Sequence, residues 1–360
     1  MKRLSAFVLA SSLAVVLSAV VTESSPGPGS GAGHAREEAL SAQARAAFVK
    51  YMSSHAPLIR AQAPPGGGGT VVHSQPMAAN AASNGVEPMP SVNWSGYTDV
   101  VSGSDGTVTS VTGHWVIPSV TCPPGLYRNQ DAFAAQWVGV DGVTDQTVEQ
   151  LGTGEQCYEG QLYYYVWYEM YPQEMVEEGP ADCINSNVDC VRPGDQVSAS
   201  VTITPGTAPS AASQAGAAGT PRVNDYTLAL TDSTTPGSNF AVEATCPVET
   251  CLDQSAEWVV ERPATLLPLG AQILPLVSFS QDTFTNGAVV SGGRATSIGG
   301  FQGGPIYDVS MLDDTLSYYL DCVGQPTPAG RLLLSSDAGA CPMVPPVHGD
   351  GFSVSWDSSF

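Results

Sequence analysis

The stretch LYYYVWYEMYP at residues 162–172 decides the fold class, because aromatic and β-branched side chains of this kind favour a β-strand. Alternate residues of a strand point to opposite faces, so one face carries Tyr163, Tyr165, Trp167, Glu169 and Tyr171. A carboxylate between aromatic rings indicates a partly dry cleft, since desolvation raises the pKa of a carboxyl group. The alternative is an exposed sheet face with aromatic cross-strand pairs.

The chain has a composition typical of β-strands and turns from Val92 onward. Short runs rich in Val, Thr, Tyr, Trp and Ser alternate with Gly, Pro, Asp and Asn. The pattern predicts about ten or more strands and no helix of more than two turns, and one flat sheet of that length would not stay open. We therefore expect an all-β fold, an antiparallel β-sandwich of two packed, bent sheets of jelly-roll or lectin-like type. The predicted strands are 93–101, 108–118, 134–142, 162–172, 196–204, 226–232, 255–262, 276–281, 306–312 and 352–356.

A second informative strand is SAEWVVERP at residues 255–263. Alternation puts Glu257, Val259 and Glu261 on one face, and Trp258 and Val260 on the other, where they are expected to pack. The two glutamates then share a groove, with backbones about 13 Å apart. The strand therefore offers two candidate active-site carboxylates.

The first 89 residues are expected to be absent from the mature protein. Lys2 and Arg3 precede a mostly apolar run, which predicts a signal peptide over residues 1–21 and a secreted, extracellular protein. An N-terminal membrane anchor is the alternative, although the run is marginal in length for a bilayer. Residues 22–89 hold one predicted helix (36–53) between flexible linkers and look like a prosegment, with a disordered spacer as the alternative. The compact β-sandwich domain is expected to cover residues 90–360.

Eight cysteines follow the predicted signal peptide. An even number of cysteines in an exported chain predicts disulfide bonds. A zinc site is disfavoured because no CxxC pair occurs and the chain has 5 histidines. Short loops close easily, so we expect the pairs Cys183/Cys190 and Cys246/Cys251 first, which leaves Cys122/Cys157 and Cys322/Cys341.

Acidic side chains dominate the composition, with 34 Asp and Glu against 12 Lys and Arg and a net charge of −22. Such a surface argues against nucleic acid and membrane as partners. Its self-repulsion falls when carboxylates are protonated, which fits a protein that works in acid. The predicted prosegment is richer in basic residues, so we expect it to lie on the acidic cleft as an inhibitor until acid releases it, through Arg36, Arg45, Lys50 and Arg60.

The usual hydrolase signatures are absent from the sequence. There is no GxSxG and no HExxH, and no Asp is followed by Thr or Ser and then Gly as in the aspartic proteases. After the predicted prosegment only His114 and His348 remain, and His114 is expected on a strand surface. We expect no cofactor and no metal, and a chemistry based on carboxylates in a β-sheet groove.

Five motifs in order carry a resemblance to a known family. They are NWSGY (93–97), WVGVDG (137–142), QTVEQLG (146–152), WYEMYP (167–172) and AEWVVERP (256–263). Together they resemble the glutamic peptidases, or eqolisins, in the bacterial style, over residues 90–360. The resemblance implies a β-sandwich with a substrate cleft and a removable propeptide. It also implies acid-active endopeptidases that use a Gln/Glu pair.

The resemblance assigns roles to single residues. The catalytic glutamate falls on Glu261 and the catalytic glutamine on Gln150, which is expected to face it from a neighbouring strand; Gln146 is the fallback, because the spacing from WVGVDG differs by one residue from fungal members. Glu257 becomes a supporting or solvated carboxylate. Family positions that line the cleft or support the pair match Trp94, Trp137, Asp141, Glu169 and Tyr171.

The chemistry of such a pair can be argued from the side chains. A carboxylate can take a proton from water and later give it to the leaving nitrogen. A glutamine amide offers N–H donors to the oxyanion and an oxygen that holds the water. A glutamate has an unperturbed pKa of about 4.3, so an ionised Glu261 is compatible with work in acid.

Two other functions fit the residues. A β-sandwich glycoside hydrolase would use Glu169 and Glu261, with carboxyl groups about 5 to 10 Å apart. A carbohydrate- or protein-binding module without activity would show no turnover. The ordered motifs favour a peptidase that acts on proteins or peptides, and we expect it to be a monomer.

Overall fold

The computed structural model describes a β-sandwich that carries one short helix. The described residues are 40, 42–47, 50, 86–91, 93–101, 106–123, 131–143, 145–178, 191–206, 224–248, 250–267, 270–279, 281–300, 304–312, 332–335 and 351–356. All of them belong to the unit Leu40–Phe360. The predicted signal peptide, Cys183, Cys190, Cys322, Cys341 and His348 lie outside these residues.

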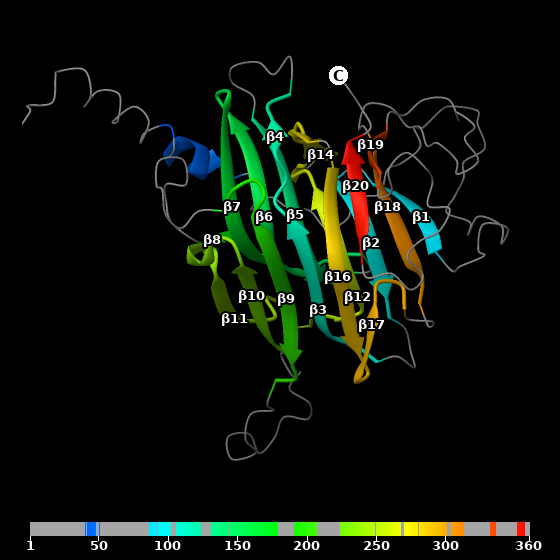
Figure 1. Ribbon diagram of the computed structural model, residues 1–360. Coiled ribbons are helices and arrows are strands. Elements are labelled where there is room, and N and C mark those ends of the chain that lie inside the picture. Colours follow the sequence, from blue (N-terminus) through cyan, green and yellow to red (C-terminus); the bar gives the residue numbers. More distant parts are fainter. Residues whose placement is uncertain are drawn as a thin grey trace, which may run out of the picture. The chain divides into compact units, whose positions relative to one another are not determined.

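One layer of the sandwich consists of consecutive hydrogen-bonded strands that hold the candidate site residues (Figure 1). Its strand order is β18 (Ile306–Leu312), β2 (Trp94–Val100), β12 (Ser255–Glu261), β5 (Ala132–Val140), β6 (Val148–Tyr158), β7 (Gln161–Tyr171) and β8 (Val176–Glu178). Pairing within this layer is antiparallel, and β1 (Val86–Ser91) adds a parallel strand beside β18. The predicted boundary between residues 89 and 90 therefore falls inside a strand.

The second layer has the order β11 (Phe240–Thr245), β10 (Asp225–Asp232), β9 (Gln196–Thr204), β3 (Val108–Val116), β16 (Gln281–Ser291) and β20 (Phe352–Trp356). The hairpin strand β17 (Arg294–Ser297) pairs with β16. Strand β19 (Leu332–Ser335) lies between β18 and β20, so hydrogen bonding continues from one layer to the other. Smaller pieces are β13 (Ala264–Leu267) with β14 (Gly270–Ile273), β4 (Val120–Thr121) with β15 (Ser278–Phe279), and the short 3₁₀ helix η2 (Pro236–Ser238).

The inner core lies between the two layers and combines apolar side chains from both. Tyr97, Val138 and Trp258 come from the first layer, and Trp115 and Phe284 from the second. Their rings pack closely: Trp115 and Phe284 have centroids 5.5 Å apart. Burial of this apolar surface is the main force that holds the layers together.

A second apolar group, the outer-face cluster, covers the other side of the first layer. It includes Trp94, Trp137, Tyr165, Trp167 and Val259. On β7 and β12 the two clusters take alternate residues, as strand geometry requires: Trp258 and Val260 are in the inner core and Val259 in the outer-face cluster. The predicted facing of both strands is therefore confirmed.

The predicted strands agree with the structure in most places. The ranges 196–204, 306–312 and 352–356 coincide with β9, β18 and β20, whereas the predicted strand 276–281 is replaced by the short β15 and the start of β16. Strand β6 was not predicted as a strand. The described residues within the predicted helix 36–53, namely 40, 42–47 and 50, are helical.

Two of the expected disulfides are present. Cys122 is bonded to Cys157 and Cys246 to Cys251. His114 lies half-buried on β3, where its Nδ1 is 2.7 Å from Oγ of Ser198. In the described part of the chain, no helix has both the length and the apolar character needed to cross a bilayer.

Candidate active site

The candidate site is built from four adjacent strands whose register aligns the polar residues in rows. One row runs from Glu257 through Gly139 to Gln150 and Glu169. A row two residues further along contains Val259, Trp137, Gly152 and Trp167, and the next such row contains Glu261, Ala135, Gly154 and Tyr165. All these residues point to the outer face, because Val259, Trp137 and Trp167 belong to the outer-face cluster.

Glu261 is held by two neutral donors at the end of β12. Its Oε2 accepts a 2.8 Å hydrogen bond from Nε1 of Trp137, and Nδ2 of Asn93 lies 3.4 Å from its Oε1. Asn93 is in turn fixed by the backbone of Arg262, whose N–H donates to the Asn93 carbonyl at 3.0 Å. The carboxylate is 1% exposed, so donors of this kind are what stabilise its charged form in a buried place. Asn93 was not singled out from the sequence, although it is the first residue of the NWSGY motif.

Gln150 is held from the opposite side by Glu169. The Nε2 of Gln150 donates a 2.7 Å hydrogen bond to Oε2 of Glu169. The Oε1 of Gln150 is buried without a hydrogen-bond partner. Burial raises the pKa of Glu169 well above 4.5, while the Gln150 bond acts against this rise. The Gln150 amide therefore still has one N–H and its carbonyl oxygen available to a ligand.

Gln146 occupies a different place from Gln150. It precedes β6, is exposed, and its Nε2 donates to the carbonyl of Asp145 at 3.1 Å. It lines a pocket of about 400 Å³ together with Asp145, Thr147, Tyr171, Pro172, Val248, Thr250 and Leu252. The geometry therefore puts Gln150, and not the fallback Gln146, beside Glu169.

Trp137 lies between Glu261 and Gln150. A Cβ added at Gly139 would be 2.9 Å from Cζ3 of Trp137 and 3.1 Å from Cβ of Gln150. The six-membered ring of the indole thus covers Gly139 next to Gln150, while the Nε1 end reaches Glu261. Any side chain at Gly139 would displace the indole. Trp94 packs against this ring edge-on, with centroids 4.8 Å apart.

The expectation that Glu261 faces Gln150 from a neighbouring strand is wrong. Strand β5 lies between β12 and β6, and along β5 the two residues are opposite Ala135 and Gly139. On a flat sheet this separates their Cα atoms by roughly 16 Å. The side chains therefore bracket a space beside the Trp137 indole and do not touch.

The alternative that Glu257 is a solvated carboxylate is also wrong. Glu257 is fully buried on β12. Burial raises its pKa well above 4.5, and the charges of Asp141, Asp145 and Asp99 add to this rise. The alternation of residues along the strand predicted the correct face for Glu257. The burial of that face depends on packing against strands that are distant in the sequence.

A catalytic role of Glu261 predicts that Trp137→Phe lowers kcat/KM for a peptide substrate about tenfold, because the substitution removes a donor to Glu261 but keeps most of the ring. The acid limb of the pH–rate profile should move to higher pH, since a hydrogen bond to the charged form is lost. The matched control is Trp167→Phe, which removes an indole N–H in the same row. Equal effects of the two variants would argue that packing, and not the bond to Glu261, is responsible.

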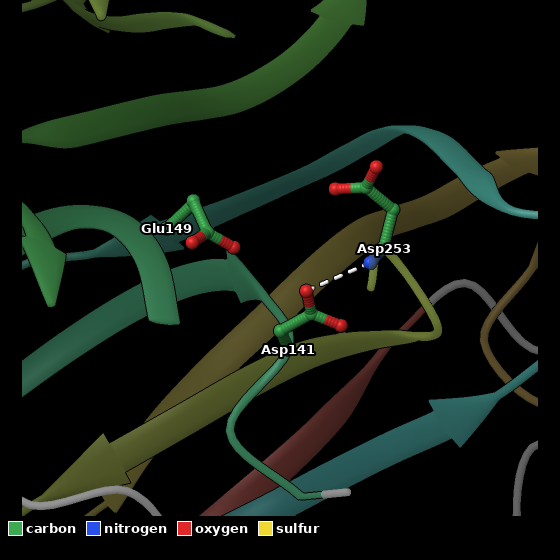
Figure 2. A group of neighbouring side chains, drawn as sticks. All are labelled: Asp141, Glu149 and Asp253. Carbon is green, nitrogen blue, oxygen red and sulfur yellow. Dashed lines mark hydrogen bonds between the residues drawn. The ribbon is translucent and has the colours of Figure 1, made fainter. Parts of the chain in front are cut away.

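Asp141 is buried at the end of β5 and faces away from the outer face. Its Oδ2 accepts the backbone N–H of Asp253 at 2.7 Å (Figure 2), and its Oδ1 accepts the backbone N–H of Gln254 at 2.8 Å. These bonds connect the chain directly after β5 to the segment that leads into β12, which is compatible with a supporting role for Asp141.

Tyr171, the last residue of β7, is half-buried and lines the 400 Å³ pocket.

Several more carboxyl groups are buried around the site and in the inner core. Burial, reinforced by Asp145, raises the pKa of Asp141 from 3.8 to about 8. Burial also raises the pKa of Asp282 from 3.8 to about 7 and that of Glu155 well above 4.5. At neutral pH the fold must therefore either keep protons on these groups or bear buried charge.

The free energy of unfolding is expected to be highest in acid and to fall as the pH rises from about 4 to about 8. A carboxyl group with a raised pKa binds its proton more tightly in the folded state. Its contribution is complete below the unfolded pKa and is lost as the pH rises through the folded pKa. Urea midpoints between pH 3 and pH 8, in buffers without divalent cations, measure this directly. A midpoint that rises toward neutral pH would contradict it.

Comparison with known proteins identifies the family of the chain. A family model described as the Peptidase A4 family matches residues 92–323, which include all five motifs. Aspergillopepsin-2 of Aspergillus niger is 28% identical over 219 residues, which are 56% of this chain and 66% of that protein, so the chain spans just under two thirds of this curated relative.

Two solved structures are similar to this chain at low identity. Scytalido-glutamic peptidase with a peptide-based transition-state analogue aligns with 74% of this chain and 98% of its own, at 20% identity and a TM-score of 0.43. Aspergilloglutamic peptidase from Aspergillus niger aligns with 62% and 99%, at 22% identity and a TM-score of 0.34. The family match covers more than half of the chain and confirms the resemblance of its motifs: the protein belongs to the Peptidase A4 family, the glutamic peptidases.

Proposed function

We propose that the protein is a secreted, acid-active endopeptidase in which Glu261 and Gln150 hydrolyse the peptide bond. One observation carries the proposal: on a single face, a buried Glu261 is held by Trp137 and Asn93, and Gln150 is held by Glu169. Each member is fixed by its own partner, and the Trp137 indole lies between them. Such fixed groups need no reorganisation during a reaction, which is how electrostatic stabilisation becomes effective.

The reaction proceeds through Glu261 as general base and then general acid. Ionised Glu261 removes a proton from a water molecule, which attacks the carbonyl carbon of the peptide bond. The free N–H of Gln150 donates to the oxyanion as it forms. Glu261 then gives its proton to the leaving nitrogen, and the C–N bond breaks. Glu169 positions the Gln150 amide by accepting its other N–H.

A glycoside hydrolase that uses Glu169 and Glu261 has less support. These residues lie on β7 and β12, with β5 and β6 between them. Three strand spacings alone separate the strands by about 14 Å, and the two residues are also in different rows. Carboxyl pairs of glycosidases are about 5 to 10 Å apart.

The function is tested by product analysis after incubation of the mature protein at acid pH. A denatured protein should yield new amino termini, and polysaccharides should yield no new reducing ends. Sugar cleavage without proteolysis would favour the glycosidase, and no turnover of either substrate would favour a binding module.

We further propose that residues 1–21 are a signal peptide and that residues 22–89 are a prosegment that inhibits the enzyme. Two contacts of the helix support inhibition. Ala44 is fully buried within the outer-face cluster, which also holds Trp137 and Trp167. Nε of Arg45 lies 2.7 Å from Oε2 of Glu177 on β8. The helix thus packs on the face of the sheet that carries Glu261 and Gln150.

Acid is expected to weaken this inhibition through Glu177. Burial raises the pKa of Glu177 from 4.5 to about 7, and the charge of Arg45 acts against this rise. The part of the binding that comes from the charge of Arg45 is lost when acid protonates Glu177. A peptide of residues 22–89 should inhibit the mature enzyme at pH 7 and release it in acid.

Glu177→Gln should raise the inhibition constant of this peptide at pH 7 about fivefold, the upper range for a partly exposed ion pair. It should also flatten the dependence of that constant on pH. Glu178→Gln is the matched control, because it removes the same charge from the next residue of β8. No inhibition by the peptide at any pH would reject the role of the prosegment.

A further inference from the structure

Three buried carboxylates from three segments of the chain meet on the inner side of the first layer. This acidic trio consists of Asp141 after β5, Glu149 on β6 and Asp253 before β12 (Figure 2). Each offers an oxygen atom, and these atoms lie within 4.8 Å of one another. The exposed fractions are 0% for Asp141 and Glu149 and 2% for Asp253.

Two members of the trio are held in place by donors. Asp141 accepts the backbone N–H groups described above. Asp253 accepts the hydroxyl of Tyr226 at 2.6 Å on Oδ1 and Nδ2 of Asn224 at 2.5 Å on Oδ2. These bonds fix the carboxylates without neutralising them, because every donor is uncharged. Within the described part of the chain, no Lys or Arg forms an ion pair with the trio.

Glu149 supplies an independent sign that something binds here. Its Oε2 is buried without a hydrogen-bond partner. Its Oε1 lies 3.2 Å from Sγ of Cys251, but that sulfur is bonded to Cys246 and has no proton to donate. Figure 2 shows the Glu149 carboxylate directed at Asp141. A fully buried carboxylate oxygen without a donor is costly unless a cation or a proton compensates it.

We propose that the acidic trio binds one Ca²⁺ ion. Calcium takes oxygen ligands at about 2.3–2.6 Å, so oxygens on opposite sides of the ion are about 5 Å apart. The oxygens of the trio lie within 4.8 Å of one another, so one ion of this kind can contact all three. Magnesium dehydrates reluctantly and is usually bound through one or two carboxylates and several waters, so a fully buried set of three carboxylates favours calcium. Zinc prefers nitrogen and sulfur ligands, whereas the trio offers carboxylate oxygens.

Bound calcium would join three segments that carry the proposed catalytic residues. Glu149 directly precedes Gln150 on β6, Asp141 directly follows the strand that holds Trp137, and Asp253 leads into the strand that ends at Glu261. The ion would also balance the charge of groups that otherwise have to be protonated. The proposed ion therefore stabilises the fold at neutral pH, and this inference does not depend on the proposed peptidase activity.

Binding can be tested on the full chain at pH 7 with two probes. Thermal unfolding is followed with CaCl₂, with MgCl₂ and with NaCl of equal ionic strength. Tb³⁺, which replaces Ca²⁺ at oxygen sites, is added separately, and its luminescence is excited through tyrosine. The hydroxyl of Tyr226 is 2.6 Å from Asp253, so energy transfer is expected. Neither readout requires catalytic activity.

The variants are Glu149→Gln and, as the matched control, Glu155→Gln. Glu155 is equally buried on the same strand, and its Oε2 accepts Nε2 of Gln136, so it does not belong to the trio. At Ca²⁺ about 100 times above Kd, the Tm of wild type and Glu155→Gln should rise by roughly 5–10 °C. Glu149→Gln should show neither this rise nor the Tb³⁺ signal.

Two results would overturn the proposal. The first is a wild-type Tm that Ca²⁺ raises no more than Mg²⁺ or NaCl does, with no saturable Tb³⁺ luminescence; protons alone would then compensate the trio. The second is an equal response to Ca²⁺ in Glu149→Gln and wild type, which would place the ion elsewhere. The wild-type measurement decides the question even if a variant fails to fold.

Discussion

Glu261→Gln is expected to lower kcat/KM for a denatured protein substrate at least about 100-fold while the fold is kept. The amide of glutamine has nearly the shape of the carboxyl group and can still accept a hydrogen bond from Nε1 of Trp137, so packing at the end of β12 is retained. It cannot take a proton from water at any working pH. The loss should therefore appear in kcat, and KM should change little.

Glu257→Gln is the matched control for this variant. Both glutamates lie on β12, point to the same face and are buried, at 0% and 1% exposure. Glu257 has no bond to Trp137 and is expected to tolerate the change with kcat/KM within about tenfold of wild type. Activity close to wild type in a folded Glu261→Gln protein, with loss in Glu257→Gln, would move the catalytic role to Glu257.

Gln150→Ala is expected to have an effect of similar size. Removal of one oxyanion donor typically costs about 100- to 1,000-fold in kcat. The change also leaves Oε2 of Glu169 without the donor that it has at 2.7 Å, which costs stability because Glu169 is fully buried. Initial rates and urea midpoints should be measured on the same preparation, so that the two losses are separated.

Gln156→Ala is the matched control for Gln150→Ala. Gln156 lies on β6, is fully buried, and its Oε1 accepts the Tyr165 hydroxyl at 2.9 Å. It is six residues away on the same face of the strand. If Gln156→Ala reduced the rate as much as Gln150→Ala, the effect would come from loss of buried amide packing and the oxyanion role would be rejected.

The sequence predicted the all-β class and the two most informative strands because their alternation is strong. On β7 and β12, large apolar residues alternate between two buried faces, and both faces were assigned correctly. The disulfide Cys246–Cys251 followed from its short loop. These features depend on neighbours along the chain, which a sequence displays directly.

Strand β6 was not predicted because its amino-acid composition is unusual for a β-strand. Its sequence VEQLGTGEQCY contains Glu, Gln and Gly, which are uncommon in strands, yet ten of its positions are buried. Local rules of this kind fail most often at functional sites, where the role of a residue outweighs its propensity. The glycines are needed here: a Cβ at Gly152 would collide with the Gln136 carbonyl.

The relations between strands also lay beyond the sequence. The position of β5 between β12 and β6 is a matter of strand order, and it changed Glu261 and Gln150 from neighbours into groups on either side of Trp137. The acidic trio combines residues 141, 149 and 253, so only the folded chain brings it together. Asn93 was missed for the same reason, since its contact with Glu261 spans 168 residues.

The central claim is that an ionised Glu261 activates water in acid. The most direct measurement is the initial rate of cleavage of a denatured protein by the mature enzyme from pH 2 to pH 7, with pepstatin present and with Glu261→Gln in parallel. Our account predicts cleavage in acid that pepstatin does not block, with rates of the variant lower by at least about 100-fold across the range. Equal rates for wild type and the folded variant, or complete inhibition by pepstatin, would contradict it.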